Sequence, residues 1–438
     1  MFRVLLFIIF SFQIIICQEK SDKSTERYIL LGGTAHVGNG EVIENSTIII
    51  EGEKIIAIGS SDLVIVNKKR GITYDLKGKH IYPSFILPNT TLGLVEIDAV
   101  RATRDERETG NLNPNVRTQI AYNTESIVTS TVRTNGILLA QVVPRGALIS
   151  GTSSIMKLDG WNWEDATYLK DDGIHLYWPE LHDYHYHGHS HVFTASDIAE
   201  EKEEKTKILE SINSLNNLFQ KAKHYSKTKN KEIDLRLKSL QGLFNETKKL
   251  YIHVNGANSI KESILFAKKH NVKKIVLVGA SESWRITEFI QKHDIPIILG
   301  RVHSLPNYPE DDIDQVYKTP KILKESGILF CLDYAGDMPR MGSRNLPFLA
   351  GTTVAYGLKK EEALELITLN TAKILGIDDR TGSLETGKEA NLFISTGDAL
   401  DMISHNIEML FLMGKKVSLE NHQTKLYDKF LEKFEIKK

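Results

Sequence analysis

Short apolar runs recur through the middle of this chain, and helical patterns separate several of them. Strands that alternate with helices are typical of a parallel sheet covered by helices. Eight such runs predict a (β/α)8 barrel of the TIM type, an α/β fold. The predicted barrel strands are 81–87, 137–143, 154–158, 174–178, 250–253, 274–278, 296–299 and 328–332.

Three of the intervening stretches have the apolar spacing of helices. In 200–225, apolar residues recur at i, i+4, i+7 and i+11 from Ile208 to Phe219, which places them on one helix face. A second amphipathic stretch covers 231–249, and a third covers 361–375. The many Lys and Glu residues of the first two indicate solvated faces and not interaction tails.

The two ends of the chain have the rhythm of β-structure. Residues 28–80 consist of short apolar runs broken by Gly and Asn, and the same rhythm returns over 383–420. We therefore predict a small β-sandwich domain built from both chain ends around a barrel of residues 81–382. Residues 421–438 are expected to form a helical tail.

The first residues predict a targeting segment. Arg3 precedes the apolar run 4–16, which is too short to span a bilayer and is typical of a signal peptide. Cleavage near Cys17 would remove residues 1–17, so we expect a periplasmic or secreted protein. Acylation of Cys17 is the alternative, and the bulky Ile16 argues against it. No later stretch is apolar enough to be expected to span a membrane.

Charge and cysteine content exclude several classes. Lys plus Arg is 55 and Asp plus Glu is 56, so the formal charge of −1 removes the electrostatic case for nucleic acid or an anionic membrane as partner. Only Cys331 would remain after cleavage at Cys17, so no internal disulfide is expected. Cys331 lies in an apolar run and is predicted to be a buried, inert thiol.

Three stretches carry more specific patterns. Residues 368–376 read T-L-N-T-A-K-I-L-G, residues 382–393 read G-S-L-E-T-G-K-E-A-N-L-F, and residues 78–86 read G-K-H-I-Y-P-S-F-I. Together they resemble the amidohydrolase superfamily, in its imidazolonepropionase-like branch. The resemblance implies the barrel with a composite β-domain, and hydrolysis of a C–N bond other than a peptide bond in a small molecule. The patterns themselves are structural and carry no chemistry.

The resemblance also implies a metal centre at the C-terminal mouth of the barrel, where the metal activates water. The family takes two ligands from a His-x-His after strand 1, and others from His residues of strands 5 and 6. Asn89 and Thr91 stand at the His-x-His positions of this chain, and Val278 stands at the strand 6 position. Amide and hydroxyl groups are poor ligands for Zn²⁺. His253 matches the strand 5 ligand.

The family's acidic residue of strand 8 corresponds to Asp333 or Asp337. The expected cofactor is therefore none, or one weakly bound divalent metal with Zn²⁺ as the family default. His253 would hold it, with His303 or Asp333. His303 follows the seventh predicted strand, and with His253 and Asp333 it forms a candidate catalytic cluster for acid–base chemistry. The alternative is that His303 is a loop residue and that His253 merely persists.

Candidate substrate-binding residues lie on two loops. Trp161, Trp163 and Glu164 follow the third predicted strand and are expected to line a pocket with apolar walls and a few polar groups. They equally fit the start of a helix capped by Asn162. Arg301, two residues before His303, is a further candidate.

The stretch 182–191 contains alternating histidines, which lie on one face of an extended segment and can chelate Zn²⁺, Ni²⁺ or Cu²⁺. Adventitious chelation or no role is the expectation, because alternation alone fixes no geometry.

Two classes of function follow. The first is an exported hydrolase of the amidohydrolase type that acts on a small molecule, with its usual metal site largely lost. The second is an inactive relative that binds a ligand, or that serves as partner subunit of an active paralogue. A homo-oligomer is compatible with either class.

Overall fold

The structure is a computed structural model. It describes residues 26–65, 67, 70–180, 195–229, 232–335 and 339–435. The expected signal segment with Cys17, the histidine stretch 182–191 and Asp337 lie outside these residues. Within the described part, none of the helices combines the length and the apolar character needed to cross a membrane.

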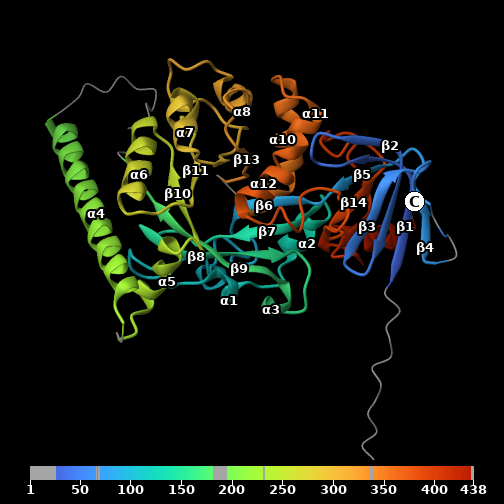
Figure 1. Cartoon of the computed structure of the whole chain (residues 1–438), viewed down its shortest axis with the longest axis horizontal. Helices are drawn as coiled ribbons and strands as arrows, with labels where there is room; N and C mark the ends of the chain where they lie inside the picture. The colour runs from blue at the N-terminus through green and yellow to red at the C-terminus, as the bar shows by residue number, and fades with distance from the viewer. Residues whose placement is uncertain are drawn as a thin grey trace, which may run out of the picture.

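One eight-stranded sheet forms the barrel, at the centre of Figure 1. Its strands follow the order β13-β12-β11-β10-β9-β8-β7-β6. This confirms the predicted TIM-type barrel. The strands are β6 (Phe85–Thr90), β7 (Ile137–Val142), β8 (Ile149–Lys157), β9 (Thr167–Tyr177), β10 (Lys249–Val254), β11 (Ile275–Gly279), β12 (Ile297–Leu299) and β13 (Phe330–Leu332).

Strand β8 departs from the regular pattern because it runs antiparallel to both of its neighbours, β7 and β9. The other neighbouring pairs of the barrel sheet are parallel. The chain turns directly from β7 into β8 through residues 143–148, with no helix between them. The end of β8 pairs with the beginning of β7, as Lys157 with Leu139, so β8 ends at the face opposite the mouth.

The barrel wall closes through a break in a helix. Hydrogen-bonded strands run from β13 to β6, and between these two edges the carbonyls of Leu366 and Ile367 accept bonds from Leu332 N (3.3 Å) and Ile86 N (2.9 Å). Because these two carbonyls bond to the edge strands, they cannot accept the hydrogen bonds of a continuous helix. The predicted single helix over 361–375 is therefore wrong. It is split into α11 (Lys360–Glu365) and α12 (Leu369–Leu375).

The second sheet combines strands from both chain ends, in the order β16-β15-β14-β5-β1-β2-β3, with β4 paired to β1. It confirms the predicted β-domain from the two ends. The turn between β2 and β3 folds back against the segment before β14, where Ile55 N donates to Lys388 O (2.9 Å). The strands are β1 (Arg27–His36), β2 (Val42–Glu51), β3 (Lys54–Ser60), β4 (Ile72–Asp75), β5 (His80–Pro83), β14 (Leu392–Ser395), β15 (Ile407–Leu412) and β16 (Lys415–Val417).

The seam between the two parts lies at Ser84. Strand β5 pairs with β1 and β14 of the end sheet, although the sequence assigned residues 81–83 to the barrel. Ser84 N still donates to Asn391 O of the end domain (2.9 Å), whereas Phe85 N donates to Gly136 O of the barrel (2.8 Å). The apolar run 81–87 is therefore shared between two sheets, and its hydropathy gives no sign of the change.

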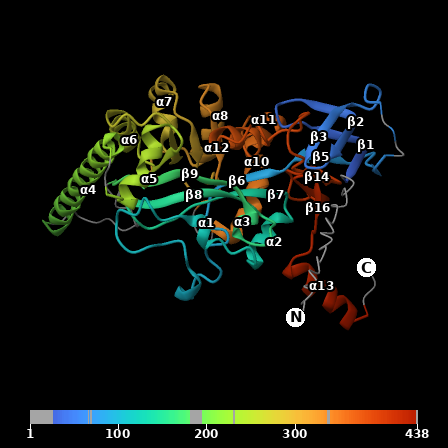
Figure 2. The same cartoon turned by 60° about the horizontal axis from the view of Figure 1, so that its bottom comes forward.

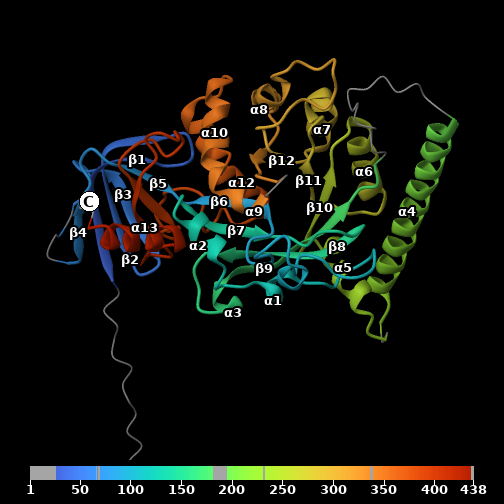
Figure 3. The ribbon, with the colours of Figure 1, turned by 180° about the vertical axis from the view of Figure 1, so that it is seen from behind.

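Helices cover the barrel unevenly. Figure 3 shows the short α1, α2 and α3 on one side of the barrel sheet, away from α6, α7, α8 and α10. The long α4 stands at the edge of the molecule, and α13 lies outside the barrel against α2 (Figures 1 and 2). The remaining helices are α1 (Thr118–Ala121), α2 (Ile127–Arg133), α3 (Trp163–Ala166), α4 (Ala195–Lys227), α5 (Leu235–Phe244), α6 (Ala257–Lys269), α7 (Thr287–His293), α8 (Gln315–Glu325), α9 (Pro339–Gly342), α10 (Leu346–Ala355) and α13 (His422–Lys433).

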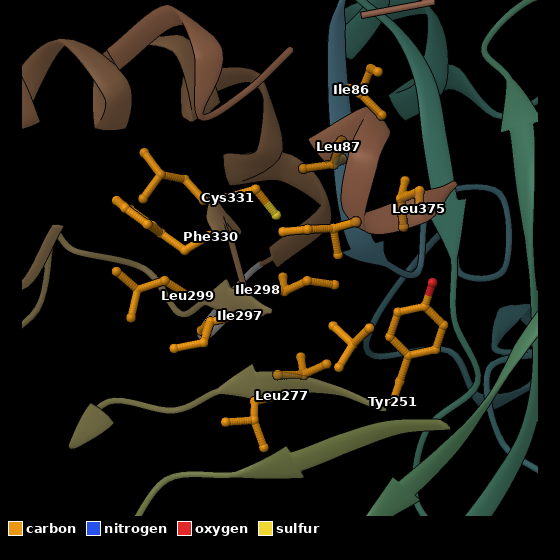
Figure 4. Close-up of a cluster of buried hydrophobic side chains, with 14 of the residues drawn as sticks. Ile86, Leu87, Tyr251, Leu277, Ile297, Ile298, Leu299, Phe330, Cys331 and Leu375 are labelled. Atoms are coloured by element: carbon orange, nitrogen blue, oxygen red, sulfur yellow. The ribbon is translucent and has the colours of Figure 1, made fainter. Parts of the chain in front are cut away.

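The barrel encloses one large apolar core. Side chains of β6, β10, β11, β12 and β13 meet there with Leu375 of α12 (Figure 4). Cys331 belongs to this core and is fully buried, as predicted. Burial raises the pKa of its thiol far above the usual range, so the thiolate does not form near neutral pH.

Candidate active site at the barrel mouth

The mouth is built from residues at the carboxyl ends of the parallel strands. Asn89 lies near the end of β6, and Asp333 directly follows β13. Asn89 Nδ2 donates to Asp333 Oδ2 over 2.5 Å. Asn89 has a φ of +49°, in the left-handed region that Asn tolerates better than most residues. Asn89 and Asp333, at the strand 1 and strand 8 positions that the family resemblance indicated, are therefore in direct contact.

Asp333 is the titratable group of this cluster that is tuned to neutral pH. Its side chain is 1% exposed, and burial raises its pKa to about 7. Hydrogen bonds from Asn89 and from the backbone N–H groups of Tyr334 and Ala335 oppose that rise. A carboxyl group with such a pKa can accept or release a proton at physiological pH.

Arg145 brings a fixed positive charge to the mouth. It lies in the connection 143–148 between β7 and β8, and its Nη1 donates to Asn89 Oδ1 (2.5 Å) and Tyr177 Oη (3.0 Å). Its Nη2 donates to the backbone oxygen of Asn89 (2.6 Å). No sequence pattern had indicated Arg145 as a site residue. The Pro144-Arg145-Gly146 tripeptide between two apolar runs was an available signal for a tight turn at a strand end.

A histidine pair lies beside Arg145. His253 Nε2 and His175 Nδ1 are 2.9 Å apart, so one ring donates a hydrogen bond to the other. Tyr177 stacks on His253 with centroids 4.0 Å apart, and Tyr251 stacks on His175 at 4.7 Å. Burial lowers the pKa of both imidazoles well below the usual value, and the charge of Arg145 lowers it further. Both rings are therefore neutral near pH 7.

His175 and Tyr177 were likewise not among the residues predicted for the site. They lie two residues apart on β9, so their side chains share one face of the strand. That face turns toward His253 of the neighbouring β10, whose register pairs His253 with Tyr177. The alternation of two polar aromatic side chains near the end of a predicted strand was the available signal.

A buried polar network supports the mouth from below. The carboxylate of Asp172 accepts hydrogen bonds from Ser153 Oγ (2.6 Å), Gln141 Nε2 (2.9 Å) and Tyr251 Oη (2.8 Å). Gln141 Oε1 in turn accepts a bond from Asn89 N (3.2 Å). The network fixes Asn89 and Tyr251, and it gives Ser153 a structural partner.

His303 lies apart from the other two members of the candidate catalytic cluster. It is exposed, its Nε2 is 2.7 Å from Thr352 Oγ1 of α10, and its ring faces Tyr317 of α8 at 6.1 Å. Within the described residues, no three His, Cys, Asp or Glu side chains are grouped so that they could hold a metal. The expected cluster of His253, His303 and Asp333 is not formed, because the loop after β12 carries His303 toward the outer helices.

The residues predicted to line an aromatic pocket lie at the end of the barrel opposite the mouth. Trp161, Trp163 and Glu164 follow β8, and the reversed direction of β8 places them opposite the mouth. Trp161 is 88% exposed, and Trp163 packs against a small separate core. The alternative interpretation as a helix start is confirmed, because Asn162 Oδ1 accepts a bond from Asp165 N (2.8 Å).

A groove of about 1550 Å³ adjoins the mouth. It lies between α4 and α6 and extends over the loops after β9, β10, β11 and β12 to Ala335, close to Asp333. Arg301 lines it, with its guanidinium 5.7 Å from the ring of Tyr334. Glu180 also lines it and accepts the backbone N–H groups at the start of α6. The groove provides space for a ligand next to the mouth.

The donors at the mouth do not fit the divalent metal that the family resemblance implies. The positions where the family has histidines are occupied here by the amide of Asn89, the hydroxyl of Thr91 and the alkyl group of Val278. The Asn89 amide is also committed at both ends, to Arg145 and Asp333. A guanidinium cation beside these positions disfavours a second cation. We therefore assign no chemistry at the mouth to a metal.

The barrel, the composite end sheet and a polar mouth at the strand ends define the architecture of the amidohydrolase type. An amidohydrolase from Thermotoga maritima has the same fold, with a TM-score of 0.75 and 21% identity over 89% of this chain and 99% of that one. A model of the amidohydrolase family matches residues 185–420. The chain belongs to the amidohydrolase family.

Other similarities are more distant. An ochratoxinase from A. niger matches with a TM-score of 0.53 and 13% identity over 91% of this chain and 98% of that one. A prolidase complexed with N-methylphosphonate-L-proline matches with a TM-score of 0.53 and 14% identity, over 90% and 99%. An imidazolonepropionase from Thermoplasma volcanium is 30% identical over 121 residues. That match spans 26% of this chain and 30% of the relative.

Proposed function

We propose that this protein hydrolyses a carbon–nitrogen bond other than a peptide bond in a small molecule, without the ordinary metal centre of its family. Membership of the amidohydrolase family supports the reaction class. The partial match to an imidazolonepropionase is consistent with it. The single observation that carries the metal-independent part is Asp333, a carboxyl group at the mouth whose pKa is raised to about 7.

In this mechanism, Asp333 acts as the general base. It takes a proton from a water molecule that attacks the carbonyl carbon, and it returns a proton to the leaving nitrogen as the C–N bond breaks. Neutral His253 is partly exposed at the mouth, so its imidazole edge is available to the substrate. Asn89 and Arg145 hold the carboxyl group in place and keep part of its negative charge stabilised.

A ligand-binding protein without catalysis is the second candidate. The observation that favours it is the enclosure of Asp333, which is 1% exposed and accepts bonds from Asn89 and from two backbone N–H groups. A base held in this way needs displacement of one bond before water can reach it. In this case the chain would bind a ligand, or pair with an active paralogue.

Substitution of the two mouth residues separates the candidates. The purified full chain is assayed by chromatography for ring opening of a panel of cyclic amides, imides and ureas, beside the Asp333→Asn and His253→Ala variants. Hydrolysis by the proposed mechanism predicts a loss of about 10²–10⁴-fold for Asp333→Asn, with the fold intact by circular dichroism. An active Asp333→Asn protein would rule out the mechanism, and a folded wild type inactive on the whole panel favours the binder.

Export is a further part of the proposal and rests on residues 1–17 of the sequence alone. The chain is expressed in its native host and its N-terminus is determined by mass spectrometry. A mature chain that begins near Gln18 is the expected result. Recovery of the peptide that begins at Met1 would contradict it.

A further inference from the structure

The guanidinium of Arg145 uses one edge for hydrogen bonds to Asn89, and its other edge has no partner among the described residues. A guanidinium has five N–H donors in a planar fork. The edge formed by Nη1 and Nη2 donates to the two oxygens of Asn89, and the second hydrogen on Nη1 goes to Tyr177 Oη. The Nε hydrogen and the second Nη2 hydrogen have no acceptor among the described residues. These two parallel donors form the side edge of the group.

The guanidinium group of Arg145 lies at the mouth. Arg145 is only half-buried, between Asn89 at the end of β6 and Tyr177 at the end of β9. Two polar atoms of the mouth are buried without a partner in the described part of the chain, namely Thr91 Oγ1 and His175 Nε2. Buried polar atoms are usually hydrogen-bonded, so these two unpaired atoms can serve as partners for a ligand at the mouth.

The backbone holds this edge in a fixed orientation. Arg145 N donates to Glu106 O (2.7 Å), and Val143 N donates to Thr90 O (2.8 Å). Pro144 O accepts a bond from Ser150 Oγ (3.0 Å). The short connection is thus fixed on both sides, and the side chain is held by three hydrogen bonds. Binding of a ligand here therefore costs little conformational entropy, because the guanidinium is already ordered.

The local charges favour an anion. Asp333 contacts Arg145 only through Asn89, so its carboxyl does not occupy the free edge. Arg145 therefore brings to the mouth a permanent positive charge whose second edge has no counter-ion among the described residues.

We propose that the free edge of Arg145 binds the carboxylate group of a small-molecule ligand through two parallel hydrogen bonds. The geometry of Nε–H and Nη2–H matches the two oxygens of a carboxylate, which is the pairing that arginine makes best. The inference rests on the proposed function in one respect: it names the substrate class as small molecules that carry a carboxylate. Binding itself requires no catalysis.

Equilibrium binding of simple probes tests the site. Titration of the full chain with acetate and glutarate, by calorimetry or ligand-observed NMR, is compared with acetamide as the neutral isostere. Acetate should bind and acetamide should not. Arg145→Met should weaken carboxylate binding about tenfold or more, and Arg145→Lys should weaken it as well, because an ammonium has no paired edge.

Arg107→Met is the matched control, because it removes an equal charge close to the same connection. Arg107 is 59% exposed and lies near Gly146, so its loss should change binding less than about twofold. Equal binding of acetate and acetamide by the wild type would overturn the inference. Unchanged binding by a folded Arg145→Lys protein would overturn it too.

The outcome is independent of the hydrolysis assay. Carboxylate binding that Arg145→Met abolishes supports the site even if no C–N bond is cleaved by the wild type. Turnover of a substrate with no binding of, or inhibition by, acetate or glutarate overturns the site and leaves the proposed function standing.

Discussion

The side-chain amide of Asn89 joins the end of the first barrel strand to Asp333, which follows the last one, over 2.5 Å. The neighbouring carbonyls of Leu366 and Ile367 close the wall between the same two strands. The oxygen of the Asn89 amide accepts from Arg145. One amide thus links the closure of the barrel to the charged groups of the mouth.

Removing this amide should destabilise the fold. In Asn89→Gly the backbone keeps its left-handed conformation, while Asp333 and Arg145 each lose a buried partner. The free energy of unfolding in urea should fall by about 1–3 kcal/mol. Asn45→Gly is the control, since Asn45 is exposed and has a similar φ of +47°. Equal effects of the two substitutions would contradict the prediction.

Asp333 should make stability depend on pH. Its pKa rises from 3.8 to about 7 on folding, so the folded state holds a proton that the unfolded state has lost between these values. The resulting stabilisation is complete below about pH 4 and disappears as the pH rises through 7. Relative to Asp333→Asn, wild type should therefore lose free energy of unfolding from pH 5 to pH 8, on the order of a few kcal/mol. A constant difference would argue against it.

His175 should act in the opposite direction. Burial lowers its pKa well below 6.5, so the unfolded state binds a proton that the folded state excludes. Wild type should lose stability as the pH falls below about 6.5, and His175→Phe should lose less over the same range. Phe preserves the stacking on Tyr251. Chemical unfolding of both proteins at pH 5 and pH 7 provides the comparison, and parallel curves would be evidence against a neutral buried imidazole.

Substitutions of the two tryptophans near α3 should differ in their effect on protein stability, and neither should affect ligand binding. Trp161→Ala should change the free energy of unfolding by less than about 0.5 kcal/mol, because Trp161 is 88% exposed. Trp163→Ala should cost about 1–3 kcal/mol, since Trp163 packs on a small core. Neither should change ligand binding at the mouth. A specific loss of binding in Trp161→Ala would restore the aromatic pocket.

Metal analysis should show no tightly held stoichiometric ion at the mouth. The protein used is a variant in which the five histidines of the 182–191 stretch are replaced by serine, so that chelation by this stretch is removed. Equilibrium dialysis against Zn²⁺ should then give only weak binding, because Asn89 and Thr91 replace two imidazoles. One equivalent of Zn²⁺ retained through gel filtration would refute this expectation.

The sequence was sufficient for the barrel and for the composite end sheet. Alternating apolar runs report that strands exist, and the match of residues 382–393 to a family pattern reports where the end sheet resumes. Strand direction leaves no trace in hydropathy, so the reversal of β8 was missed. Its consequence was the wrong position of Trp161 and Trp163.

The site residues were predictable only where a single residue could be matched to a single position of the family pattern. His253 and Asp333 were found in this way, and the structure places both at the mouth. Arg145 and His175 were missed, because their importance depends on neighbours from other strands. His303 shows the reverse error: its place after β12 suggested the mouth, but its contact with Thr352 turns it outward.

Reversing one strand also redistributes which parts of the chain are free to change. In a regular barrel each strand contributes a rim loop, whereas here the segment after β8 belongs to the floor and the short segment 143–148 alone serves two strands at the rim. Variation after β8 would alter the floor and leave ligand selectivity untouched. Variation within 143–148 would reach the rim directly, so a change in specificity could be acquired, or engineered, through this single connection while the other strands keep their places.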